Sequence, residues 1–126
     1  MSTNSLRPEL RWTIEAAQSK KASGITVLDF ATLGAFTDAF FLCTGYSARQ
    51  VQAISDEIEE QLARRGLRAA HREGYETADW VLLDYGGFIV HIFSERARHY
   101  YDLERLWRAA GRTDVPDAVA PGAAQA

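Results

Sequence analysis

The chain has 126 residues, of which 47% are hydrophobic, 14 are Lys or Arg, and 17 are Asp or Glu. This composition is typical of one globular domain, which is long enough to bury a core without the help of a disulfide or a metal. The formal charge of −3 argues against a strongly cationic nucleic-acid binder. We therefore expect little direct contact with nucleic acid, and a basic protein surface as the more favourable partner.

Cysteine usage and hydropathy indicate the compartment. Cys43 is the only cysteine of the sequence, so no intramolecular disulfide can form, and its apolar neighbours predict a buried, inert thiol. No apolar run approaches the roughly 20 residues that a membrane span needs. The N-terminus carries no signal-peptide core. We therefore expect a cytoplasmic protein that makes no contact with a membrane.

The first part of the chain predicts one helix and two strands. Residues 6–22 have apolar side chains at helical spacing, and Pro8 lies in the first turn, where its missing N–H is harmless. Residues 25–30 are rich in β-branched and aromatic side chains, which favours a strand. Residues 39–44 are apolar throughout, so we expect a central strand that is covered on both faces.

A second helix is expected to begin after Ser47. Ser47 and Gln50 form a capping box, in which the serine hydroxyl accepts an early helix N–H and Gln50 reaches back. Gly66 is a favourable residue just after a helix end. The acidic residues of this helix are either a solvated face with pairs such as Glu60–Arg64, or a docking surface for a basic partner. They are Asp56, Glu57, Glu59 and Glu60.

The second half of the chain predicts three strands and a last helix. Residues 68–73 suit a short edge strand. Residues 80–85 and 88–93 are β-prone runs on either side of Gly86-Gly87, a pair that can supply positive φ at both central positions of a hairpin turn. Residues 94–110 predict one continuous helix that is capped by its initial serine.

This order of elements predicts an α/β or α+β domain, and we adopt α/β. Helices are expected to pack on one mixed sheet of about five strands. We expect a flexible N-terminus at residues 1–5, a single domain at residues 6–110, and a disordered tail at residues 111–126, where large apolar side chains are almost absent.

A serine-histidine-aspartate set is one catalytic hypothesis. A two-residue turn at Gly86-Gly87 places Asp84 opposite Ile89, so that Asp84 and His91 lie diagonally on one face of the hairpin. Ser47 would be the nucleophile, but it already caps a helix, and no G-x-S-x-G elbow surrounds it. A structural hydrogen bond is therefore the better interpretation of Asp84 and His91.

Nucleotide binding is the more serious alternative. The turn at residues 45–47 offers N–H groups to a phosphate and resembles the Gly-Ser entry of nucleotidyltransferases. Those enzymes need two carboxylates on a following strand to hold Mg²⁺, whereas residues 68–73 contain Glu73 as their single acid. Phosphate-binding glycine motifs are absent from the sequence. The candidate metal ligands also lack the spacing of zinc-binding motifs. They are His71, Glu73, His91 and His99.

The C-terminal half carries two runs that resemble a known family. The run DWVLLDYGGFIVHIF at residues 79–93 and the run RHYYDLERLW at residues 98–107 closely resemble the ribosomal silencing factor family (RsfS, or Iojap-like). The resemblance spans residues 6–107 in the order of the family. Shorter matches upstream are Thr37-Asp38, Thr44-Gly45, Ser47-x-Arg49-Gln50-Val51 and Arg72-Glu73-Gly74.

The resemblance implies a function as well as a fold. It implies a nucleotidyltransferase-like shape without the catalytic acids, and a protein that is no enzyme and uses no cofactor. It implies binding to ribosomal protein fourteen on the face of the large ribosomal subunit that meets the small subunit. A domain bound there would block subunit joining and repress translation. The resemblance also implies a role in late large-subunit maturation, and family habit favours a homodimer in free solution. A nucleotide-binding or nucleotidyltransferase-like enzyme is kept as the alternative function.

The partner-facing positions of the family correspond to Trp80, Tyr85 and Tyr101. Aromatic side chains of this kind dominate interface hot spots, although each could instead belong to the core. Asp79 and Asp84 lie beside them in sequence and would meet Arg or Lys on a basic partner. Strand parity places Trp80 and Tyr85 on opposite faces unless a bulge or the strand end brings them together.

Two further expectations concern single positions. Tyr100 shares the apolar face of the predicted last helix, so Tyr101 is expected to be the more exposed of the two tyrosines. The family turn is usually Gly-Asp, whereas this chain has Gly86-Gly87. The lost carboxylate would either weaken contact with a basic partner or loosen the turn, but glycine tolerates the same backbone angles, so the hairpin should survive.

Overall fold

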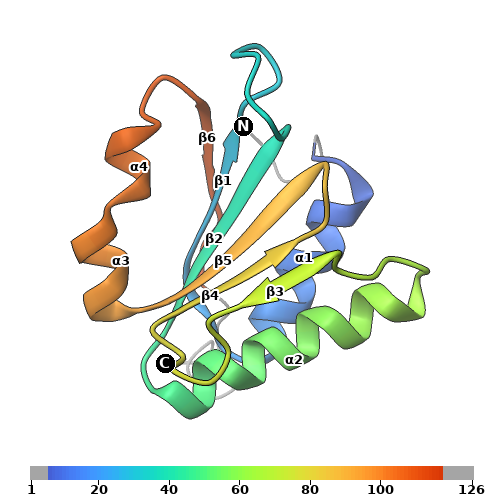
Figure 1. Cartoon of the computed structure of the whole chain (residues 1–126), viewed down its shortest axis with the longest axis vertical. Coiled ribbons are helices and arrows are strands. Elements are labelled where there is room, and N and C mark those ends of the chain that lie inside the picture. Colours follow the sequence, from blue (N-terminus) through green and yellow to red (C-terminus); the bar gives the residue numbers. More distant parts are fainter. Residues whose placement is uncertain (1–5, 118–126) are drawn as a thin grey trace, which may run out of the picture.

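The structure, a computed structural model, describes residues 6–117 (Figure 1). The expectations for residues 1–5, and for residues 118–126 of the tail, lie outside this range. The elements in chain order are α1 (Pro8–Ser19), β1 (Ser23–Asp29), β2 (Ala39–Gly45), α2 (Ala48–Arg64), β3 (His71–Glu73), β4 (Trp80–Asp84), β5 (Phe88–Ser94), α3 (Glu95–Tyr101), α4 (Leu103–Leu106) and β6 (Gly111–Asp114).

The strands form one mixed sheet in the order β3-β4-β5-β2-β1-β6. β2 and β5 run parallel, and α2 lies within the connection between them, while the other neighbouring strands are antiparallel. β2 lies inside the sheet and all seven of its residues are buried, which confirms the predicted central strand. β3 is an edge strand with three exposed residues, as predicted.

Helices cover the two faces of the sheet unequally. α1 and α2 lie together on one face (Figure 1), where they pack on residues such as Phe41, Val90 and Ile92. α3 and α4 lie on the other face (Figure 1), where Leu42, Phe93 and their neighbours form a second, smaller cluster. α3 and α4 are short and cover only part of this second face. The β4 side chains that point toward it are therefore only half-buried.

The β4–β5 hairpin has the predicted register. Asp84 pairs with Ile89, and Tyr85 N–H donates to the Phe88 carbonyl at 3.0 Å. Gly86 adopts a φ of 84°, whereas Gly87 does not adopt positive φ. Thus one of the two glycines, rather than both, provides the left-handed backbone that the turn requires.

Two predictions about the C-terminal part are wrong. The sheet has six strands rather than about five, because residues 111–114 of the expected disordered tail form β6 along β1. The last helix is not continuous over residues 94–110, because Asp102 adopts a left-handed φ of 48° and separates α3 from α4. Within residues 6–117, no helix is long and apolar enough to cross a membrane.

Candidate partner-binding site

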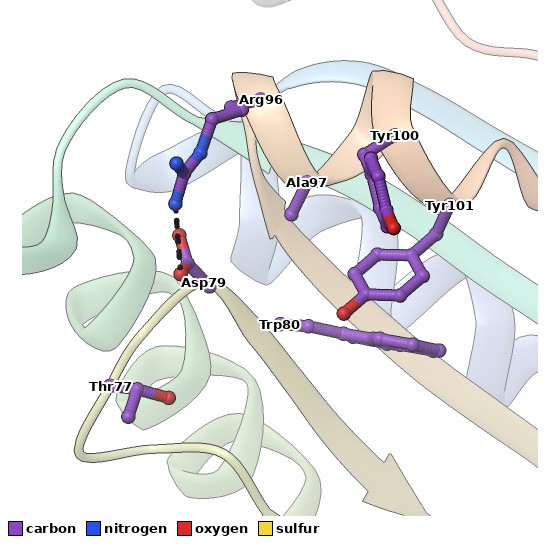
Figure 2. A pocket seen from close by; sticks show the side chains of 7 residues that line it. All are labelled: Thr77, Asp79, Trp80, Arg96, Ala97, Tyr100 and Tyr101. Carbon is purple, nitrogen blue, oxygen red and sulfur yellow. Dashed lines mark hydrogen bonds and ion pairs between the residues drawn. The ribbon is translucent and has the colours of Figure 1, made fainter.

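A pocket lies where the start of β4 meets the start of α3. Trp80, at the first position of β4, pairs with Phe93 near the end of β5, and α3 follows directly after β5. This register brings the two segments together and encloses about 460 Å³ (Figure 2). The pocket is lined by Thr77, Asp79, Trp80, Arg96, Ala97, Tyr100 and Tyr101.

Trp80 forms the floor of this pocket. Its indole Nε1–H donates to His91 Nδ1 at 3.0 Å, so one edge of the ring is fixed to β5. The indole contacts the Phe93 ring at 5.2 Å between ring centres and the Tyr101 ring at 4.6 Å. Trp80 is therefore half-buried, with one side packed on the sheet and the other facing the pocket.

Tyr101 and Tyr100 form the wall above Trp80 (Figure 2). Tyr100 is 78% exposed and Tyr101 is 48% exposed, so the expectation that Tyr101 is the more exposed tyrosine is wrong. Contact with Trp80 explains the difference. The Tyr101 ring packs on the Trp80 indole at 4.6 Å between ring centres, which covers part of it, whereas the Tyr100 ring contacts the Tyr101 ring.

Asp79 gives the pocket a carboxylate. One carboxylate oxygen accepts a hydrogen bond from the Ser94 hydroxyl at 3.1 Å. The other accepts from Arg96 at 3.5 Å (Figure 2). The Arg96 side chain is 85% exposed and that of Asp79 is 53% exposed, so solvent weakens this ion pair. Asp79 is therefore available to a second cation. Arg96 and Thr77 were not predicted as site residues, although the hairpin register places the starts of β4 and α3 side by side.

Asp84 and Tyr85 lie at the far end of β4. Asp84 points to the same face as Trp80 by strand parity, and it accepts the Gly86 N–H at 2.8 Å. Tyr85 packs instead on the α1–α2 face, where its ring stacks on Phe88 at 5.0 Å. Burial raises the pKa of the Tyr85 hydroxyl above its ordinary value. The structure thus brings Asp79, Trp80 and Tyr101 together and leaves Tyr85 on the opposite face.

The candidate catalytic set is not assembled. His91 is 3% exposed and accepts the Trp80 indole N–H, so the expected diagonal bond with Asp84 is wrong. Burial lowers the pKa of His91 to about 3, and the ring is neutral at physiological pH. The Ser47 hydroxyl is bound to the N–H of Gln50 at 3.0 Å as a helix cap. His91 is therefore a core residue that supports Trp80.

The turn at residues 45–47 is closed by its own capping box. The Gln50 side chain accepts the Tyr46 N–H at 2.6 Å and donates to the carbonyls of Lys20 and Lys21. A Cβ atom on Gly45 would lie 2.9 Å from the Val51 side chain, so glycine is required here for close packing of the turn on α2. Two of the N–H groups that a phosphate would use are already occupied, which disfavours the nucleotide interpretation.

The acidic face of α2 is largely paired within the molecule. Glu59 binds Arg72 at 3.0 Å, and Asp56 accepts the Tyr75 hydroxyl at 3.0 Å. Glu60 forms the predicted pair with Arg64 at 3.3 Å. These contacts fasten the edge strand β3 and its following loop to α2, and they favour a structural role for the acidic run over a docking surface.

Cys43 is a buried, free thiol. Burial raises the pKa of the Cys43 thiol to about 12, so the thiol is protonated and unreactive at neutral pH. In the part of the chain that the structure describes, no three His, Cys, Asp or Glu side chains converge on a point that could hold a metal ion.

Comparison with known proteins identifies the family. The family described as "Ribosomal silencing factor during starvation" (RsfS) matches residues 3–126. The chain belongs to the ribosomal silencing factor family. The RsfS protein of Bacillus subtilis is 39% identical over 106 residues, which are 84% of this chain and 90% of that protein.

Solved structures agree with this assignment to RsfS. A crystal structure from Chromobacterium violaceum is 30% identical with a TM-score of 0.78, covering 97% of this chain and 99% of that one. A second, from Bacillus halodurans, is 36% identical with a TM-score of 0.74, covering 84% and 96%. The α/β fold with a mixed sheet is thus shared with RsfS relatives, and the family role is regulation of the ribosome.

Proposed function

We propose that this RsfS-family chain represses translation by binding the large ribosomal subunit and blocking its joining with the small subunit. The contact is ribosomal protein fourteen at the intersubunit face, which is the partner that the family resemblance implies. A domain bound there occupies the space that the small subunit needs. It therefore acts as a steric block and not as an enzyme.

The observation that carries this proposal is the aromatic pocket beside Asp79. Trp80, Tyr100 and Tyr101 present large ring surfaces that are not covered by the rest of the described chain. Such residues supply much of the binding energy at protein interfaces. The Asp79 carboxylate at the edge of the pocket complements a Lys or Arg side chain of a basic ribosomal protein. Asp84, on the same face of β4, extends the acidic character toward the hairpin turn.

Subunit joining gives the direct test. Separated subunits are mixed with and without the protein, and joining is followed by sedimentation. The protein is expected to hold the large subunit in the unjoined peak, and to sediment with it. Joining that is unchanged at saturating protein would refute the steric mechanism, and absence of the protein from the large-subunit peak would refute the binding.

Single substitutions locate the contact. Tyr101→Ala is expected to weaken large-subunit binding by ~1–4 kcal/mol, as expected of an interface hot spot. Tyr46→Ala is the matched control, because Tyr46 is also exposed, at 63%, but lies in the turn before α2. Tyr85→Ala is expected to lower stability rather than binding. Circular dichroism must show that each variant is folded, and equal binding of the Tyr46 and Tyr101 variants would place the contact elsewhere.

Three further properties accompany the proposed function. The exposed aromatic pocket favours a homodimer in the free protein, which would compete with the ribosomal partner for one surface. Sedimentation equilibrium of the wild type and Tyr101→Ala tests this, since the substitution is expected to weaken the dimer. We also propose a cytoplasmic location and a contribution to late maturation of the large subunit.

A further inference from the structure

The corner between α3 and α4 carries the tyrosine wall of the pocket, yet these helices bury little apolar surface. α3 has seven residues and α4 has four, and their buried residues are Ala97 and Leu103. Helices this short are not stable by themselves. The corner therefore needs an attachment to the sheet besides apolar packing.

Arg98 supplies this attachment. Its guanidinium donates to the Gly24 carbonyl at 2.8 Å, and to the hydroxyls of Thr44 at 3.1 Å and Thr26 at 3.3 Å. Three further hydrogen bonds, between 2.8 and 3.3 Å, go to the carboxylate of Glu104. A single side chain of α3 thus connects β1, β2 and α4.

The ion pair is shielded from water. The Arg98 side chain is 15% exposed and that of Glu104 is 17% exposed. Burial by itself would raise the pKa of Glu104, but the hydrogen bonds and the charge of Arg98 outweigh it, and the pKa lies below its ordinary value. If one member of such a pair is lost, the other remains as an uncompensated buried charge. Loss of the Glu104 charge is therefore expected to drive Arg98 toward water and to loosen α3.

Arg98 lies one helical turn before the end of α3. The N–H of Asp102, the left-handed residue that ends α3, donates to the Arg98 carbonyl at 3.1 Å. Tyr101 lies between these two residues in the sequence, and its ring packs on the Trp80 indole at 4.6 Å with the two ring planes tilted by 46°. We infer that the Arg98–Glu104 pair holds Tyr101 over the indole and so shapes the partner-binding pocket. The consequence for binding rests on the proposed function, whereas the consequence for the geometry of the pocket does not.

The test replaces Glu104 by glutamine (Glu104→Gln), which removes the charge and keeps the shape of the side chain. Glu60→Gln is the matched control, because it removes the same charge from an exposed ion pair on α2. The readout is the indole N–H resonance of Trp80, which is assigned with the Trp80→Phe variant. The Tyr101 ring packs against the indole, so a shift of that ring changes the chemical shift of this resonance. Glu104→Gln is expected to move this resonance, and Glu60→Gln is expected to leave it unchanged.

Binding to isolated large subunits tests whether the pair acts through Tyr101. Glu104→Gln is expected to weaken binding on the order of tenfold. In a Tyr101→Ala background the same substitution is expected to weaken binding no further, because two changes that act through one contact are not additive. Glu104→Asp keeps the charge on a side chain that is one methylene shorter. It is expected to cause a smaller shift of the Trp80 resonance and a smaller loss of binding.

Two outcomes would overturn the inference. One is a folded Glu104→Gln protein whose Trp80 resonance is unchanged. The other is an equal loss of binding with and without Tyr101, which would indicate a general structural role. If Glu104→Gln fails to fold, Glu104→Asp replaces it: a smaller shift of the Trp80 resonance and a smaller loss of binding that depends on Tyr101 are then expected, and an unchanged resonance would overturn the inference. If the wild type does not bind large subunits, the proposed function fails, and the Trp80 resonance still decides the inference.

Discussion

Lowering the pH is expected to destabilise this protein through His91. The His91 ring is 3% exposed, lies 4.4 Å from the Phe40 ring, and accepts the Trp80 indole N–H at 3.0 Å. Burial lowers the pKa of His91 from 6.5 to about 3. A protonated ring could no longer accept the indole N–H, so protonation opposes both the buried position of His91 and its support of Trp80.

The sign and size of the effect follow from the two pKa values. Between about pH 3 and pH 6.5 the unfolded chain binds one more proton at His91 than the folded chain, so the free energy of unfolding falls as the pH falls through this interval. Each pH unit below the unfolded pKa costs about 1.4 kcal/mol. From about pH 7 to about pH 5 the expected loss is therefore about 2 kcal/mol.

Urea unfolding, followed by tryptophan fluorescence across this pH interval, measures the loss. His91→Gln is the comparison, because glutamine does not titrate and can still accept from the Trp80 indole. Glu104 and Asp114 have pKa values below their ordinary ones, so their contributions to stability are lost at lower pH than that of His91. The wild type should lose about 2 kcal/mol more than His91→Gln. An equal pH dependence of the two proteins would refute the assignment to His91.

Three further predictions concern the turn, the last strand and the thiol. Gly87→Asp is expected to raise the free energy of unfolding by ~0.5–1 kcal/mol in urea titrations, because it restricts the unfolded chain and places a carboxylate beside Arg7; added salt should reduce the gain. A chain that ends at residue 110 lacks β6 and the buried Val115, and it is expected to lose at least about 2 kcal/mol of stability, compared with a chain that ends at residue 117. Cys43 is expected to resist a thiol reagent at neutral pH until the protein is unfolded, and rapid labelling of the native protein would contradict its burial.

The central strands and the hairpin could be predicted because their signals are local. An unbroken apolar run places β2 inside the sheet, and the Gly86-Gly87 turn sets the register of β4 and β5. Strand parity also predicts correctly that Trp80 and Tyr85 lie on opposite faces of the sheet. β4 is regular over its five residues up to Asp84, so side chains alternate between the faces as expected. Where neighbouring residues determine the local structure, the amino-acid pattern is sufficient to predict it.

The missed features depend on contacts between distant segments. β6 has the sequence Gly-Arg-Thr-Asp, which has no strand pattern, and it is a strand because β1 offers it an unpaired edge. The break at Asp102 interrupts a sequence with helical spacing. Arg98, before the break, and Glu104, after it, bind each other against β1 and β2. Such tertiary contacts override local helix propensity. The exposure of Tyr101 likewise depends on a distant residue, because its ring packs on Trp80 of β4.

We expect the glycine at position 87 to affect the fold rather than recognition. A Cβ atom at this position would lie 3.4–3.5 Å from the guanidinium nitrogens of Arg7, and Arg7 already binds Asp38 and the Gly87 carbonyl at 3.3 Å. The acid that the family usually has here would thus join an intramolecular cluster at the far end of the hairpin. The turn lies about 20 Å along β4 from Trp80, at about 3.3 Å per residue. Its departure from the family pattern is therefore expected to change the stability of the turn and to leave the partner-binding pocket intact.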